Sequence, residues 1–124
     1  MSIRDSDAGC GEIAEDRACE ILKGEGYEIV ARNWRCRTGE IDIIARDGPV
    51  LAFVEVKARR TDAFGGPEMA VDRAKQRRII SAARRFLSAR ACELPIRFDV
   101  VTFVGPIVRL YRDAFCVEDE CSPG

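Results

Sequence analysis

Residues 50–58 spell VLAFVEVKA, the clearest strand in the chain and the anchor for the rest of its fold. Successive side chains of a strand point to opposite faces of the sheet, so alternate residues share a face. One face carries Leu51, Phe53, Glu55 and Lys57. Valine and alanine fill the other face. Because both faces begin apolar, the pattern predicts a central strand that is covered on both sides.

This strand ends in two opposite charges. Glu55 and Lys57 interrupt an apolar face and stand roughly 7 Å apart at strand spacing. Burying charged groups is costly unless they are paired or bound to a metal ion. The interruption therefore suggests a functional site. The alternative is a surface ion pair, which contributes under about 1 kcal/mol.

A second carboxylate lies on the preceding strand. Residues 40–46 alternate in strand fashion around Asp42, and the turn signal Asp47-Gly48-Pro49 leads back into residues 50–58. Pairing register sets faces in steps of two. An even loop of two or four residues places Asp42 on the face of Glu55, and a four-residue loop places the two directly opposite. An odd loop separates them and excludes a shared metal site.

Two carboxylates on one face suit Mg²⁺ or Mn²⁺, and the backbone carbonyl of Val56 is a further candidate ligand. Such an ion polarises a phosphodiester and lowers the pKa of bound water. Lys57 would orient or activate that water, or neutralise charge that develops on phosphorus. The chain has no histidine. Ser-His and Cys-His mechanisms are therefore excluded, and catalysis must use carboxylates, lysine, arginine and metal.

The remaining elements lie outward from this hairpin. Periodicity and turn signals predict helices over 11–24 and 69–91, and strands over 27–34, 97–104 and 107–111. Short loops make the first three strands antiparallel, and the long helix can return the chain for a parallel pairing. The order α-β-β-β-α-β-β predicts an α/β domain over 11–112, a mixed central sheet with helices on its faces. Residues 1–10 are expected to be flexible, and 113–124 to form an acidic tail.

The composition is that of one globular domain. The chain has 124 residues, of which 47% are hydrophobic and 33% are charged. No apolar run approaches the length of a membrane span, and residues 1–5 lack the apolar core of a secretion signal. We therefore expect a cytoplasmic protein without membrane attachment. The six cysteines form no CxxC pair, and reduced thiols are expected in that compartment.

Charge is distributed unevenly along the chain. The net charge of −1 argues against a nucleic-acid binder, yet residues 57–90 hold ten basic and three acidic side chains. This segment is either a solvated helix face or a surface that binds a polyanion. The candidate DNA-phosphate contacts are Arg59, Arg60, Lys75, Arg77 and Arg78. Contacts of this kind carry no sequence information.

The residues Asp42, Glu55 and Lys57 form the string D-x(12)-E-V-K, which resembles the PD-(D/E)xK nuclease pattern. The wider strings RNWRCRTGEIDIIARDG, LAFVEVKARR, FGGPEMAVDRAKQRRI and RFDVV resemble the YraN family. That incompletely characterised bacterial family is allied to archaeal Holliday-junction resolvases. The resemblance covers about residues 11–104. It implies a restriction-endonuclease-like fold, with the two acids as metal ligands and the lysine as catalytic residue.

The resemblance also implies a helix-borne acid. Glu15 matches the family's helix glutamate, which would ligate the metal through water. The family usually has glycine just before this position, whereas Ala14 stands here, so Glu12 is the rival. A solvent-facing glutamate is the alternative from the residues alone. A second departure is Ile41, which precedes Asp42 where the broader superfamily has proline.

Four further residues are assigned near the site. Glu40 shares the strand face of Asp42 and is either a carboxylate that tunes the ligands or a charge at the strand entry. Gln76 falls on the apolar side of the long helix and is expected to point toward the site. The resemblance implies that Arg35 and Arg37 hold phosphate, and solvated loop cations are the alternative.

These observations favour a Mg²⁺- or Mn²⁺-dependent DNA endonuclease that hydrolyses phosphodiesters. The resemblance implies branched or junction DNA as the substrate and, by analogy, a homodimer. The alternative is a non-catalytic DNA-binding or protein-adaptor module that has kept a nuclease fold, because a fold does not dictate a function.

Overall fold

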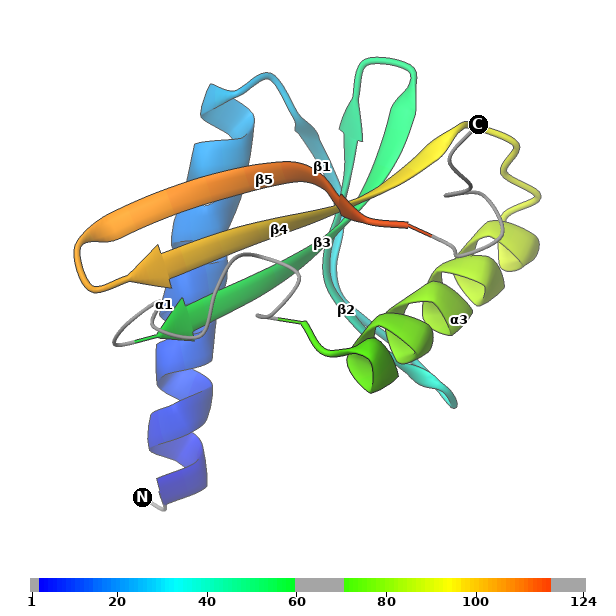
Figure 1. The fold of residues 1–124 in the computed structure, drawn as a ribbon. Coiled ribbons are helices and arrows are strands. Elements are labelled where there is room, and N and C mark those ends of the chain that lie inside the picture. Colours follow the sequence, from blue (N-terminus) through cyan, green and yellow to red (C-terminus); the bar gives the residue numbers. More distant parts are fainter. Residues whose placement is uncertain (1–2, 60–70, 117–124) are drawn as a thin grey trace.

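The computed structural model describes residues 3–59 and 71–116 and follows the predicted order of elements (Figure 1). The elements are α1 (Ile3–Gly24), β1 (Glu28–Cys36), β2 (Gly39–Asp47), β3 (Val50–Arg59), α3 (Arg73–Ala89), β4 (Ile96–Val104) and β5 (Ile107–Phe115). α1 begins at Ile3, where the sequence predicted a flexible segment. Each residue added to an existing helix gains one hydrogen bond, whereas starting a helix orders several residues for a single bond. A polar stretch can therefore continue a helix that an amphipathic stretch starts.

The five strands form one mixed sheet in the order β1-β2-β3-β4-β5. β3 pairs with β4 in parallel, and the other three pairings are antiparallel. These results confirm the antiparallel first three strands, the parallel return through α3 and the central place of β3. The arrangement is a restriction-endonuclease-like α/β fold.

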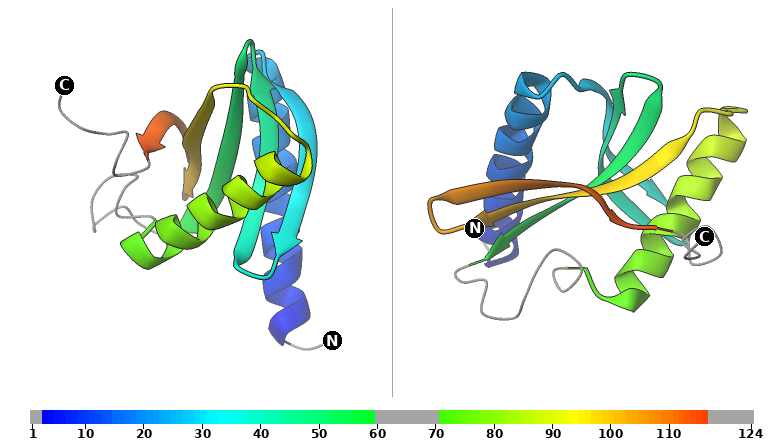
Figure 2. Two further views of the ribbon diagram at one scale, coloured as in Figure 1. Left: turned by 90° about the vertical axis from the view of Figure 1, so that its right-hand side faces the viewer. Right: turned by 45° about the horizontal axis from the view of Figure 1, so that its top comes forward.

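The two helices cover opposite faces of the sheet, as Figures 1 and 2 show. Leu51 and Phe53 pack on one face against α3 residues such as Phe86. Ala52 and Val54 pack on the other face with Leu22 of α1. The alternation read from the strand therefore corresponds to two separate apolar cores. Glu55 and Lys57 continue the α3 face beyond the apolar residues.

The hairpin between β2 and β3 has an even loop, as the metal-site hypothesis requires. Asp47 pairs with Val50 across a two-residue loop, and the register runs back to Ile43 paired with Val54. Asp42 and Glu55 are the next residues of the two strands beyond this last pair. Gly48 in the loop has φ +62°, a conformation that glycine adopts without strain.

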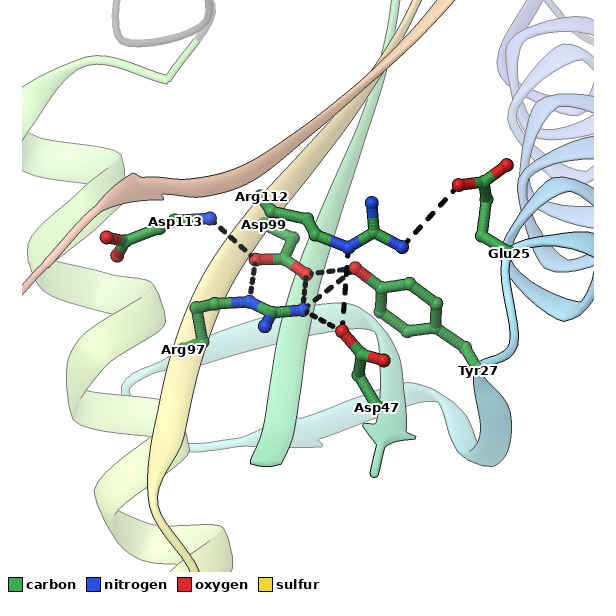
Figure 3. A network of polar contacts seen from close by, with 7 residues as sticks. All are labelled: Glu25, Tyr27, Asp47, Arg97, Asp99, Arg112 and Asp113. Atoms are coloured by element: carbon green, nitrogen blue, oxygen red, sulfur yellow. Dashed lines mark hydrogen bonds and ion pairs between the residues drawn. The ribbon is translucent and has the colours of Figure 1, made fainter. Parts of the chain in front are cut away.

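A polar network that the sequence analysis missed joins the β2–β3 turn to β4 and the start of β1 (Figure 3). Arg97 donates to both Asp99 and Asp47 at 2.8 Å, and the Tyr27 hydroxyl donates to Asp99 at 2.6 Å. Asp99 is fully buried, and the backbone N–H of Asp113 in β5 donates to it as well. Hydrogen bonds from Tyr27, Arg97 and the Asp113 backbone therefore compensate the cost of burying the Asp99 carboxylate.

The structure bears on the expected state of the cysteines and on the presence of membrane-spanning helices. Cys19, Cys36 and Cys92 are free thiols, but Cys116 is disulfide-bonded, so the expectation of reduced cysteines is wrong there. Cysteine pairing depends on how the fold brings sulfur atoms together, which spacing along the chain does not show. Among the described helices, none has the length and apolarity needed to cross a membrane.

Candidate active site

A cleft of about 310 Å³ opens where β2 and β3 separate beyond the Ile43–Val54 pair. The residues that line it come from α1, β2, β3 and α3, and are Ala14, Glu15, Asp42, Glu55, Val56, Lys57, Ala58 and Lys75. Asp42 Oδ2 accepts a hydrogen bond of 2.9 Å from the backbone N–H of Val56. The Asp42 side chain therefore contacts the β3 backbone at the residue that follows Glu55.

Glu55 lies deepest among the charged groups of the cleft, with 4% of its side chain exposed. Two ammonium groups approach the same oxygen, Oε2: Lys75 Nζ at 3.6 Å and Lys57 Nζ at 4.0 Å. Burial, followed by the charge of Asp42 and a hydrogen bond with it, raises the pKa of Glu55 well above its ordinary value. The two lysines oppose that rise.

The structure brings Glu15 to this cleft from α1. Its Oε1 is buried and has no hydrogen-bond partner among the described residues, and the guanidinium of Arg32 is 3.7 Å away. Burial raises the pKa of Glu15, a hydrogen bond from the Asn33 side chain lowers it, and the charge of Asp42 raises it. The side chain of the rival, Glu12, lies outside the described residues.

The donors present fit a hard divalent cation. Asp42 and Glu55 place two carboxylates side by side, and Glu15 lines the same cleft with one oxygen that makes no hydrogen bond to the described residues. Within the described ranges, no three acid or thiol side chains are close enough together to form a metal cage on their own. Mg²⁺ is usually held by one or two carboxylates together with water and substrate phosphate, and needs no such cage.

Two residues assigned near the site do not line the cleft. The Gln76 side chain donates to the backbone carbonyl of Val71 at 2.8 Å, so it closes the start of α3 instead of reaching the acids. The carboxylate of Glu40 pairs with Arg35 Nε at 2.9 Å. Both polar groups are bound to partners outside the cleft. Strand and helix periodicity does not reveal such partners.

The predicted DNA-binding residues fall into three groups. Lys75 is partly buried in the cleft, because the first turn of α3 lies beside the end of β3. Arg37, Arg77 and Arg78 are exposed, as a role in binding phosphate requires, and Arg35 is exposed but paired with Glu40. The Arg59 side chain and Arg60 lie outside the described residues.

Asn33 and Arg32 were not among the predicted site residues, and Lys75 was predicted only as a phosphate contact. An asparagine within a run of β-branched and aromatic residues was a usable signal for Asn33, because asparagine disfavours strands and tolerates positive φ. No local pattern marks Lys75. Its role depends on where α3 packs against the sheet.

The profile of Uncharacterised protein family UPF0102 matches residues 14–103. A UPF0102 protein of Ralstonia nicotianae is 48% identical over 116 residues, covering 90% of this chain and 89% of that protein. One from Symbiobacterium thermophilum is 53% identical over 102 residues, covering 81% and 86%. One from Geotalea daltonii is 48% identical over 97 residues, covering 77% and 76%. In each case most of both chains is aligned.

Proposed function

This chain belongs to the uncharacterised protein family UPF0102, the family that its motifs resemble, and we propose that its cleft is the active site of a metal-dependent nuclease. The observation that supports this most strongly is Glu55. A buried acid beside Asp42, approached by two lysines and lining an open cleft, has a strongly perturbed pKa. Such groups concentrate at functional sites more than at ion pairs that only stabilise a fold.

Asp42 and Glu55 would hold one Mg²⁺ or Mn²⁺ ion, with the Val56 carbonyl as a further oxygen ligand and Glu15 acting through water. The bound ion would supply Lewis acidity toward a phosphodiester and a more acidic water. The Asp42 carboxylate is oriented by the Val56 N–H, which keeps it directed at β3. Burial of Glu55 keeps bulk water from screening the charges around it.

The two lysines have separable roles. Lys57 continues the same strand face as Glu55 and would orient the attacking water. Lys75 enters from α3 and would bind the non-bridging oxygens of the phosphate, where negative charge grows in the transition state. The reaction adds water across one P–O ester bond and leaves a phosphate monoester and a free hydroxyl.

We propose DNA as the polymer, with branched DNA as the first substrate to test. Arg77 and Arg78 are exposed on α3, two and three residues beyond Lys75. This order places phosphate-binding cations on the helix that supplies the inner lysine. Contacts to phosphate fix the position of a duplex without reading its bases, which suits a structure-selective or non-specific nuclease.

The test is cleavage of junction, flap and linear DNA in Mg²⁺ or Mn²⁺ by the purified chain. Asp42→Asn, Glu55→Gln and Lys57→Ala should each lower the rate at least about 100-fold, since each removes a group that acts in the transition state. Glu20→Gln is the matched control, because Glu20 is an exposed acid of α1 that pairs with Lys23 and does not line the cleft.

Cleavage that persists unchanged in all three cleft variants would reject the proposal and indicate a contaminating nuclease. DNA binding that needs no metal and survives Glu55→Gln, without cleavage, would instead identify a non-catalytic binding module. Parallel purification of Glu20→Gln, which should keep full activity, shows whether loss in the other variants is specific.

A further inference from the structure

Strand β1 reverses its faces at one point. Arg32 points to the α1 side of the sheet, where its guanidinium lies 2.7 Å from Asp16. Trp34, only two residues later, packs on the α3 side, with its ring 5.4 Å from the ring of Phe86. Residues two apart in a regular strand share a face. The strand is therefore not regular at residue 33.

The paired strand reverses at the same level. Arg32 pairs with Ile43, which belongs to the α1 core, and Trp34 pairs with Ile41, which belongs to the α3 core. The residues between these pairs are Asn33 on β1 and Asp42 on β2. Both strands thus coil together at the position of the candidate metal ligand Asp42.

Asn33 has the backbone conformation that produces this coil. Its φ is +51°, in the left-handed region that side-chain-bearing residues seldom occupy and that asparagine tolerates best. Strained conformations of this kind cluster at functional sites, where the surrounding structure maintains them. Here the coil coincides with the fork between β2 and β3, where the cleft opens.

The Asn33 side chain reaches a second acid of the cleft. The Asn33 side chain lowers the pKa of the Glu15 carboxyl on α1, as a nearby hydrogen-bonding group does. Arg32 lies 3.7 Å from Glu15 Oε1, and that buried oxygen has no hydrogen-bond partner among the described residues. One residue of β1 therefore acts on the α1 acid, and its backbone sets the bend beside the β2 acid.

We propose that Asn33 is the positioning residue of this cleft: its left-handed backbone frees the Asp42 side chain from regular strand alternation, and its side chain holds Glu15 beside Asp42. The inference rests on the proposed function, because it assigns Asn33 to the metal ligands of that site. Hydrogen-bonded partners behind metal ligands orient them, and their removal typically costs 10- to 100-fold in metal affinity or activity.

Asn33→Gly separates the two roles. Glycine adopts a φ of +51° without strain but has no side chain to hold Glu15. The variant should keep the wild-type circular dichroism spectrum and melt within a few degrees of wild type. Its affinity for Mn²⁺ alone, measured by calorimetry, should fall about tenfold. On DNA, kcat should fall while KM stays unchanged.

A double-mutant cycle with Glu15→Gln tests whether Asn33 acts through Glu15. In the Glu15→Gln background, Asn33→Gly should cause no further loss of Mn²⁺ affinity, because groups that act as a unit are not additive. Wild-type affinity in Asn33→Gly, or losses that add fully, would overturn the inference alone. A wild-type chain that binds no Mn²⁺ would overturn the proposed function, and the inference with it.

Discussion

Glu55 shows how one side chain acquires its chemistry from its surroundings. Its carboxylate is buried at the end of an apolar strand face, beside Asp42, with Lys57 and Lys75 near the same oxygen. Three acids and two lysines line the cleft. A divalent cation bound there would offset the crowding of acids that helps to raise the pKa of Glu55.

The variant Lys75→Met should show whether Lys75 binds the reacting phosphate or only contacts DNA away from the reaction. Methionine keeps the length and removes the charge, so we expect kcat to fall about 100-fold with KM within about twofold, as for loss of one oxyanion donor. Arg77→Ala is the matched control, because Arg77 is exposed and lies two residues further along α3. It should raise KM and leave kcat near wild type. A Lys75→Met variant that changes only KM would contradict this role.

Two contacts of α3 fix its position beside the cleft. α3 begins after Asp72, whose side chain accepts the Lys75 backbone N–H at 2.8 Å, a cap that satisfies one free donor of the first turn. Further along, the backbone of α3 at Arg78 packs directly on the β1–β2 turn at Gly39. The cap and this contact together define where the first turn of α3, and therefore Lys75, lies.

Gly39→Ala should loosen that contact. An added Cβ would lie 2.9 Å from the backbone oxygen of Arg78, a distance at which the backbone must shift. We expect a loss of about 1–3 kcal/mol in the free energy of unfolding, as for overpacked cores, measured by urea denaturation. Gly24→Ala is the control, since its Cβ would meet nothing within 4 Å. Equal stability of the two variants would mean that α3 can move away without cost.

Across the whole molecule, the polar network of Figure 3 ties together segments that are distant in sequence. Asp47 at the β2–β3 turn contacts Arg97 of β4 at 2.8 Å and Arg112 of β5 at 3.5 Å. Hydrogen bonding from Arg97, opposed by desolvation and aided by the charges of Arg97 and Arg112, holds the pKa of Asp47 below its ordinary value. Because the turn sets the β2–β3 register that ends just before Asp42 and Glu55, this network also supports the cleft.

Asp47→Asn should therefore destabilise the protein in a pH-dependent way. A carboxyl with a depressed pKa in the folded state contributes stability above its unfolded pKa of about 3.9, and that stability is lost as pH falls through the folded value. At pH 7 we expect a loss of about 1–2 kcal/mol by denaturant unfolding, since the bond joins charged groups. The difference from wild type should shrink below about pH 4. A gap that stays constant down to pH 2 would refute this explanation.

The uneven charge of the whole chain leads to a prediction about salt. The net charge is −1, so DNA binding must depend on local cations such as Arg77 and Arg78 on α3. Each lost phosphate contact should reduce the slope of log affinity against log salt by about 0.9. Fluorescence anisotropy over a salt series, with Arg77→Ala and Arg78→Ala against Glu20→Gln, measures this. Unchanged slopes in both arginine variants would show that α3 does not contact the DNA.

The residues alone were sufficient for those features that depend on neighbours in sequence. Alternation in residues 50–58 predicted a central strand with two covered faces, and the turn signal at Asp47-Gly48-Pro49 predicted a hairpin in which an even loop would bring Asp42 to the face of Glu55. Both follow from the two-residue period of a strand. The start of α1 was misplaced because helix propagation through polar residues leaves no apolar period to read.

Contacts between distant segments emerged only from the folded chain. Lys75 was predicted as one of several DNA-phosphate contacts and Gln76 as a group directed at the site. Packing of α3 places Lys75 in the cleft, whereas the Gln76 side chain donates to the Val71 carbonyl. The reversal at Asn33 likewise appears only where β1 and β2 coil together. Periodicity describes the faces of an element, whereas the rotation and tilt with which elements pack depend on all side chains of the core at once.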